Sequence, residues 1–250
     1  MAEAIQEGCV DGTSVTLLRD RRDSAIMRVC CDDQSTVIMK FWARRGWRAV
    51  LRGWSRTTPS WREWTALHQL WARHVPIARP LARFSIDCQS GRFSEALVIE
   101  DLGIVQTAHH ELKEAIARGD RALASLIEDD VVALTARIVR AGVLDPDHSV
   151  VNMLCLPGGQ LRRIDFELAR LVSATSRRPA LYSQMIARLV GSFVFTVQPD
   201  LERAAQFSMR LAEELSPPLR VLQSAQSMID AELERQRTSK GIDFRLTVDW

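Results

Sequence analysis

A change in the spacing of apolar residues divides this 250-residue chain into two parts and limits the folds open to it. Three short runs near the start, 15–18, 25–30 and 36–41, are apolar and are separated by polar clusters, which predicts an antiparallel meander. From about Ala108 the apolar residues recur at helical spacing. We therefore expect an α+β chain with a small antiparallel sheet followed by a mainly helical lobe.

The first lobe is expected to contain one helix and to end at a short connector. Residues 58–60 read Thr-Pro-Ser, so a hydroxyl side chain can cap a helix that proline begins. Residues 95–102 read as a further strand, with Gly103 in the connector. We therefore assign 1–102 to an N-lobe and 103–250 to a C-lobe.

The C-lobe combines helices with a small hairpin. Asp120 can cap a long amphipathic helix that stops at Gly142. A Pro-Gly-Gly turn at 157–159 lies between two apolar runs, which predicts a two-stranded insert. Residues 179–237 have a helical pattern with a break at the Ser-Pro-Pro of 216–218.

The composition favours a folded chain in a reducing compartment. Hydrophobic residues make up 46% of the sequence and the net charge is only +2, which supplies a core and says little about partners. The five cysteines are odd in number and lack zinc-ligand spacing, so free thiols are favoured. The N-terminus lacks a signal-peptide pattern and the apolar stretch 189–197 is too short for a bilayer, so we expect a cytoplasmic protein.

Two aspartates and one asparagine form the chemically most informative pattern. Asp147 and Asn152 lie five positions apart in a predicted loop, and Asp165 ends the apolar run 161–164. In phosphoryl transfer one carboxylate orients the attacking hydroxyl, while an amide and a second carboxylate hold Mg²⁺ on the nucleotide phosphates. The alternatives are an ordinary Asp-Pro-Asp turn and a solvated aspartate paired with a neighbouring arginine.

A lysine and a glutamate of the N-lobe complete this pattern. Lys40 ends a predicted strand, where its ammonium can neutralise phosphate oxygens if an acidic partner fixes it. Glu63, on the tryptophan-rich helix, is the candidate partner. Otherwise Lys40 is an edge lysine, and Glu63 completes a capping box with Ser60.

The order of Lys40, Glu63, Asp147, Asn152 and Asp165 resembles that of the protein-kinase-like superfamily. It is most similar to the bacterial lipopolysaccharide kinases, which phosphorylate Kdo or core heptose sugars. The resemblance covers about 17–172 and is carried by the segments 37–40, 62–64, 75–81, 145–154 and 164–170. It implies a bilobal protein-kinase-like fold, with a nucleotide-covering N-lobe and a C-lobe that holds the catalytic loop and the metal-binding segment.

The resemblance also implies a role for each matched residue. Lys40, Glu63 and Asp147 would be catalytic, with Lys40 on the phosphates and Asp147 at the acceptor hydroxyl. Asn152 and Asp165 would bind the metal, so ATP and Mg²⁺ are the implied cofactors. The hinge beside the adenine would consist of Leu97, Val98, Ile99, Glu100 and Asp101.

Three features depart from the kinase pattern. Asp145 stands where a histidine is usual, which places a second carboxylate near the catalytic one. The nucleotide-covering loop, 19–24, contains no glycine. Glu167 replaces the usual glycine two residues after Asp165, as in many small-molecule kinases, and carries little weight. Asp145 and the glycine-free loop motivate the alternative of a pseudokinase that serves as a binding or scaffold module.

An arginine-rich and tryptophan-rich strip follows Lys40. It would suit an anionic sugar or glycolipid acceptor, or peripheral contact with the inner membrane surface, whereas nucleic acid is a less favoured partner. A solvated helix face is the simpler alternative. We expect a kinase for a hydroxyl of a lipopolysaccharide sugar or related glycan, and a kinase for another small molecule or a protein is a further alternative. The arginines concerned are Arg44, Arg45, Arg48, Arg52 and Arg56.

Overall fold

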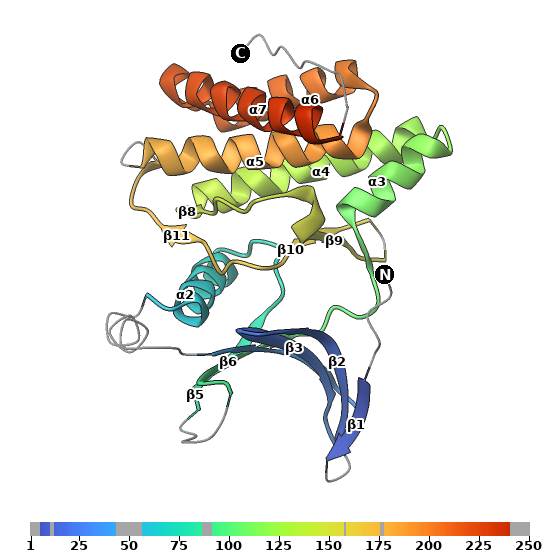
Figure 1. The fold of residues 1–250 in the computed structure, drawn as a ribbon, viewed down its shortest axis with the longest axis vertical. Coiled ribbons are helices and arrows are strands. Elements are labelled where there is room, and N and C mark those ends of the chain that lie inside the picture. The colour runs from blue at the N-terminus through green and yellow to red at the C-terminus, as the bar shows by residue number, and fades with distance from the viewer. Residues whose placement is uncertain are drawn as a thin grey trace.

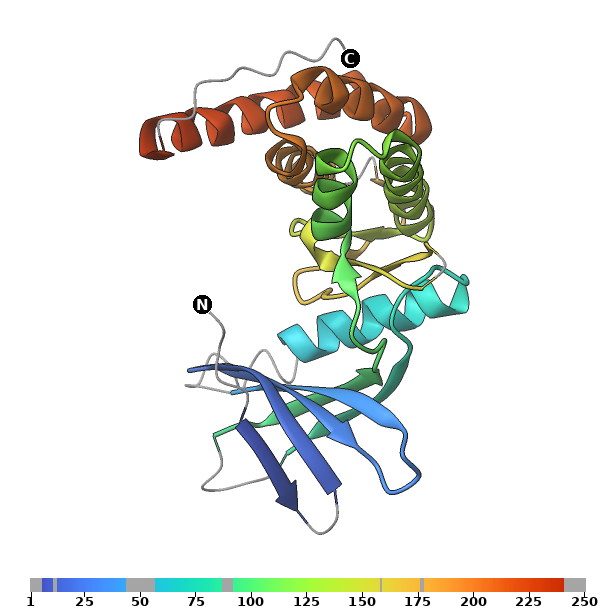
Figure 2. The same ribbon diagram turned by 90° about the vertical axis from the view of Figure 1, so that its right-hand side faces the viewer.

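The computed structural model describes residues 6–10, 13–43, 57–86, 92–157, 159–175 and 178–240. Within these ranges an antiparallel sheet is followed by a mainly helical lobe (Figure 1). The two views show the sheet at one end of the molecule and the C-terminal helices at the other (Figure 2). The expected α+β architecture with two lobes is therefore confirmed.

The strands of the N-terminal sheet lie in the order β1-β2-β3-β4-β6-β5, and each neighbouring pair is antiparallel. The predicted meander corresponds to β2, β3 and β4. The sequence does not predict β1 or β5, because β1 contains a glycine and β5 begins with a proline, and both residue types are depleted in strands. The strands are β1 (Gln6–Val10), β2 (Thr13–Arg21), β3 (Ser24–Cys30), β4 (Thr36–Trp42), β5 (Pro80–Ser85) and β6 (Glu95–Glu100).

Strand β4 is central in this sheet and carries Lys40. Its register places Lys40 opposite Ile26 of β3 and Leu97 of β6. Only 6% of the lysine surface is exposed. Lys40 is therefore not an edge lysine, and the neighbouring strands constrain the direction of its side chain.

Helix α2 (Pro59–Ala72) lies between the sheet and the C-lobe (Figures 1 and 2). It begins with proline, and the Thr58 hydroxyl caps it by accepting from the Trp61 N–H. The Ser60 hydroxyl instead donates to Glu95 of β6 at 2.6 Å. The helix is thus fastened to the sheet, and Glu63 on its buried face is free of any capping role.

The C-lobe consists of helices and short strands. One strand precedes the first helix of the lobe, and the others lie between its second and third helices. The expected hairpin is present, since β9 and β10 pair antiparallel. The elements are β7 (Gln106–Thr107), α3 (Ala108–Ala117), α4 (Arg121–Arg140), β8 (Val143–Leu144), a 3-10 turn (Val150–Asn152), β9 (Met153–Cys155), β10 (Leu161–Arg163), β11 (Arg170–Leu171), α5 (Pro179–Val197), α6 (Leu201–Leu215) and α7 (Leu219–Lys240).

Helix α5 forms the centre of the C-lobe core. It packs against α3, α6 and α7, and Phe193 stacks on Phe207 of α6 with ring centroids 3.8 Å apart. By length and composition alone α5 could span a membrane, but most of its apolar window is buried inside the lobe. The packing is that of a core helix in a globular domain.

Asp120 caps α4 as the sequence predicts, by accepting from the Leu123 N–H. The preceding helix α3 ends before Gly119, whose φ of +72° is a left-handed conformation. The boundaries differ from the sequence expectation where the long C-terminal helical pattern is interrupted at 198–200, between α5 and α6. The lobe boundary between Leu102 and Gly103 remains our proposal.

Candidate active site

The buried contact between Lys40 and Glu63 joins the sheet to helix α2. Lys40 Nζ donates to Glu63 Oε1 at 2.7 Å, and Glu63 has no exposed surface. The same ammonium lies 3.5 Å from Asp165 Oδ1. Three of the residues predicted from the sequence, which are far apart along the chain, therefore meet at one point.

The charges of these residues depend on one another. Burial alone would lower the pKa of Lys40, but Glu63, Asp165 and Glu167 attract the ammonium and raise its pKa above the ordinary value. Burial raises the pKa of Glu63 to about 7, against the opposing effect of Lys40. Glu63 Oε2 is buried and makes no hydrogen bond within the described residues, which agrees with a carboxyl group that binds a proton readily.

Backbone geometry directs Asp165 toward Lys40. Strand β10 ends at Arg163, and the Ile164 N–H donates to the Asn152 carbonyl at 3.0 Å. Asp165 then adopts a left-handed conformation with φ of +64°. Despite its burial, the attraction of Lys40 and Arg163 lowers the pKa of Asp165, so its carboxylate is ionised at neutral pH.

The predicted catalytic loop places Asp147 beside Asn152. The Asn152 amide donates to the Asp147 carbonyl at 3.2 Å and approaches Asp147 Oδ2 at 3.4 Å. Arg188 of α5 donates from Nε to Asp147 Oδ1 at 3.0 Å. Arg188 lies beyond the segment that resembles the kinases, and no sequence motif marks it.

Asp145 lies in a buried ion pair with Arg163. Their charged groups are 2.7 Å apart, and Arg163 is fully buried. The other Asp145 oxygen accepts from the Asp147 N–H at 3.1 Å. The second carboxylate therefore lies near Asp147, as the sequence predicts, and its charge is paired with Arg163 beneath the loop.

His148 extends this buried network. Its Nδ1 accepts from Arg163 Nε at 3.3 Å, so Nε2 carries the proton and faces the Thr135 hydroxyl at 2.9 Å. Burial lowers the pKa of His148 well below its ordinary value, so the ring is neutral. Arg163 also donates to the carbonyls of Asp147 and Asn152, which fixes both ends of the loop.

A cavity of about 380 Å³ opens from Lys40 toward the connector between the lobes. Lys40, Asn152 and Asp165 are among its lining residues, which places three predicted side chains at one cavity. Its apolar walls come from both lobes and suit a flat heterocyclic ring. They consist of Leu18, Ile26, Ile38, Ala78, Leu154 and Ile164.

Part of the predicted hinge lines this cavity. Ile99, Glu100 and Asp101 contribute to its wall, whereas Leu97 is fully buried in the core and Val98 lies earlier on β6. Arg28 of β3 holds the Asp101 carboxylate at 2.6 Å. This ion pair joins β3 of the sheet to the start of the connector between the lobes.

Side chains able to bind a divalent cation lie at the Lys40 end of the cavity. Carboxylate oxygens of Glu63, Asp165 and Glu167 lie within 4.8 Å of one another. Asn152 lines the same cavity and can supply an amide oxygen. Oxygen donors of this kind fit Mg²⁺, and of these four residues Asp165 and Asn152 line the cavity.

No protein-family model matches the sequence, and neither does any curated protein. Among solved structures, the chain of "WaaP in complex with acyl carrier protein" matches with a TM-score of 0.62 and 18% sequence identity. The match covers 89% of this chain and 87% of that chain. The fold of this chain is therefore similar to that of WaaP. The expected protein-kinase-like fold class is confirmed, and the likeness concerns the fold alone.

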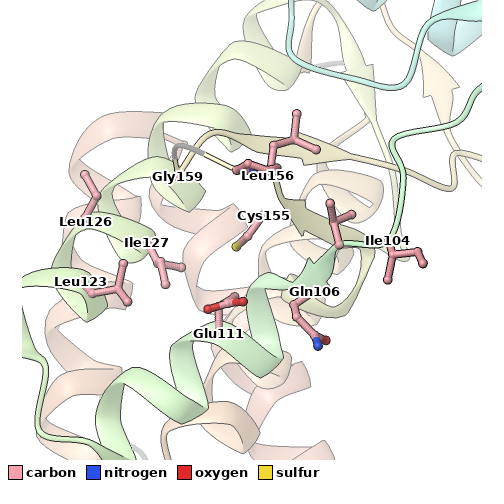
Figure 3. A pocket seen from close by; sticks show the side chains of 11 residues that line it. Ile104, Gln106, Glu111, Leu123, Leu126, Ile127, Cys155, Leu156 and Gly159 are labelled. Carbon is pink, nitrogen blue, oxygen red and sulfur yellow. The ribbon is translucent and has the colours of Figure 1, made fainter.

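A second cavity, of about 350 Å³, lies in the C-lobe near the start of α3 (Figure 3). The Cys155 thiol points into it, with Glu111 of α3 and Ile127 of α4 nearby. Burial raises the pKa of this thiol to about 12, so it stays protonated and unreactive. None of the predicted site residues lines this cavity.

The arginines predicted to recruit an acceptor lie outside the described residues. They are Arg44, Arg45, Arg48, Arg52 and Arg56. The neighbouring Trp42 lies within the described part and is buried in the core.

Replacing Arg163 by methionine should destabilise the protein by about 3–5 kcal/mol, because it leaves the buried charge of Asp145 without a partner. Urea unfolding measures this change. In the matched control, the neighbour Arg162, whose side chain is 27% exposed and pairs with Glu100, is replaced by methionine, with an expected loss below about 1 kcal/mol. Equal stability of the Arg163→Met protein and the wild type would contradict the structural role of the pair.

The raised pKa of Glu63 predicts a pH-dependent stability. In the folded protein Glu63 holds its proton up to about pH 7, compared with an ordinary value of 4.5. The stabilisation that the protonated Glu63 gives the folded state is therefore fully present below about pH 4.5 and is lost as the pH rises through 7. The glutamine variant Glu63→Gln lacks this titration, so the difference in unfolding free energy between wild type and variant should change between about pH 4.5 and pH 7, the window set by this shift. A constant difference would show that Glu63 does not titrate there.

Proposed function

We propose that this chain is an ATP- and Mg²⁺-dependent kinase that phosphorylates a hydroxyl group of a lipopolysaccharide sugar or related glycan. One observation carries the proposal: Lys40, held by Glu63, reaches Asp165 at the end of a cavity that Asn152 also lines. This arrangement supplies an ammonium and metal-binding oxygens where nucleotide phosphates would lie.

In this proposal each predicted residue has one task. Lys40 neutralises phosphate oxygens, and Glu63 fixes its direction. Asp165 and Asn152 hold Mg²⁺, which supplies charge stabilisation at the phosphates. Asp147 accepts the proton of the acceptor hydroxyl while the acceptor oxygen bonds to the terminal phosphorus and ADP leaves.

The adenine is assigned to the apolar end of the cavity. Ile99, Glu100 and Asp101 border it, and Leu18 and Arg19 cover it from β2. Arg19 is a side-chain alternative to the backbone cradle of a glycine-rich loop, because its guanidinium can pair with phosphate oxygens. Leu97 and Val98 precede these residues on β6 and hold the strand that carries Ile99 and Glu100.

The acceptor and the location complete the proposal. An anionic sugar or glycolipid fits a cytoplasmic kinase, and the arginines in 44–56 are assigned to its recruitment or to peripheral contact with the inner membrane. Nucleic acid is not proposed as a partner.

A pseudokinase is the second candidate. The observation that favours it is the β2–β3 turn at Arg22 and Asp23, where no glycine is present to let the backbone approach phosphates. Asp145, by contrast, no longer argues for inactivity, since it is paired with Arg163.

Replacing Asp165 by alanine should abolish the thermal stabilisation that ATP confers in the presence of Mg²⁺, and should reduce ADP production by about 10²-fold or more. The variant loses a carboxylate at the phosphates and metal. Replacing the exposed Asp230 of α7 by alanine is the matched control and should change neither property. Unchanged ADP production by Asp165→Ala rejects the assignment.

An acceptor panel separates the two candidate functions. ADP release is measured in parallel with purified lipopolysaccharide cores, free sugars and generic proteins. Turnover with a glycan supports the proposed kinase. Mg²⁺-dependent ATP binding without turnover on any acceptor favours the pseudokinase.

A further inference from the structure

A cavity of about 360 Å³ lies beside the proposed catalytic loop and is lined by residues of the loop, α5 and α7. Pro146, next to Asp147, forms one wall, and Gly191, Phe195 and Met228 contribute further surface. Arg188 lines the cavity and also contacts Asp147. A compound in this cavity would therefore lie close to the proposed catalytic carboxylate.

Helix α5 holds Arg188 at this position. Ser192, one turn further along and on the same face, accepts from the Val150 N–H of the catalytic loop at 3.2 Å. This face of α5 thus borders the loop directly. The position of Arg188 relative to Asp147 follows from the packing of two rigid elements.

The guanidinium of Arg188 has unused binding capacity. Only Nε is engaged, with Asp147 Oδ1, and within the described residues the two terminal nitrogens donate no hydrogen bond. Their four N–H groups form a planar fork that matches a carboxylate or phosphate. Arg188 is 54% exposed, so an anion can reach this fork without displacing Asp147.

A second arginine also lines the cavity. Arg235 of α7 forms an ion pair with Glu232, another lining residue, so a neighbouring carboxylate already balances its charge. Arg188 is the cation that both lines the cavity and touches Asp147.

We propose that Arg188 determines acceptor specificity by binding a carboxylate or phosphate group of the acceptor, whose nearby hydroxyl then lies at Asp147. The acceptor class is thus a hydroxyl compound with an anionic group a few bonds from the reacting oxygen. One nitrogen of Arg188 orients Asp147 while the fork binds the substrate, which brings the two reacting groups together. This inference rests on the proposed function, because it assigns the acceptor of the same site.

Paired ligands that differ in one charge test the proposal. The probes are Kdo against its methyl ester, and glucose 6-phosphate against glucose. Binding is measured by calorimetry at fixed ionic strength, with Mg²⁺ and a non-hydrolysable ATP analogue and again without nucleotide. The wild type should prefer the charged member of at least one pair by about tenfold or more.

Three variants locate the preference. Arg188→Gln should lose the preference for the charged ligand, and Arg188→Lys should retain part of it. Gly191→Leu should weaken the binding of both members of a pair, because the leucine side chain fills the cavity. The fold should accept this side chain, since a Cβ at Gly191 meets no atom within 4 Å. Arg140→Gln is the matched control, because Arg140 is a similarly exposed arginine in a carboxylate ion pair on α4 and should keep the preference.

The outcomes separate this inference from the proposed function. No preference for a charged ligand in the wild type, including no binding at all, overturns the inference, and so does a preference that persists in Arg188→Gln. Mg²⁺-dependent ATP binding is recorded on the same proteins. If the protein does not bind ATP but still shows an Arg188-dependent preference for the charged ligand, the proposed kinase function is rejected and the anion-binding site at Arg188 is retained.

Discussion

The buried ion pair between Lys40 and Glu63 is the interaction on which the site depends. Taking two charges out of water costs several kcal/mol for each ion, so such a pair persists only where the surrounding elements hold both partners. Here β4 is paired on both sides and α2 is fastened to β6 through Ser60. The pair in turn directs an ammonium toward Asp165, 3.5 Å away, which joins the sheet to the segment that we propose binds the metal.

A second buried ion pair stabilises the other half of the site. Arg163 pairs with Asp145 and donates to the backbone carbonyls of Asp147 and Asn152, at the two ends of the proposed catalytic loop. The loop therefore owes its shape to a charge network beneath it, whereas Asp147 stays partly exposed above.

Much of this could be predicted from local patterns. The meander, the capped α2 and the β9–β10 hairpin depend on neighbouring residues, and the order of Lys40, Glu63 and Asp165 indicated the kinase-like fold. The Asp145–Arg163 pair depends on a contact across 18 positions. Its one signal was strand alternation, since Arg163 shares a face with the buried Leu161. Arg188 carries no such signal, because only the packing of α5 brings it to Asp147.

The most direct test of the central claim is a crystal structure with Mn²⁺ and a non-hydrolysable ATP analogue, in which anomalous scattering locates the metal. The account predicts Mn²⁺ coordinated by Asp165 and Asn152, phosphates at Lys40, and adenine beside Ile99 and Asp101. A nucleotide bound elsewhere, or a metal that contacts neither Asp165 nor Asn152, would contradict it.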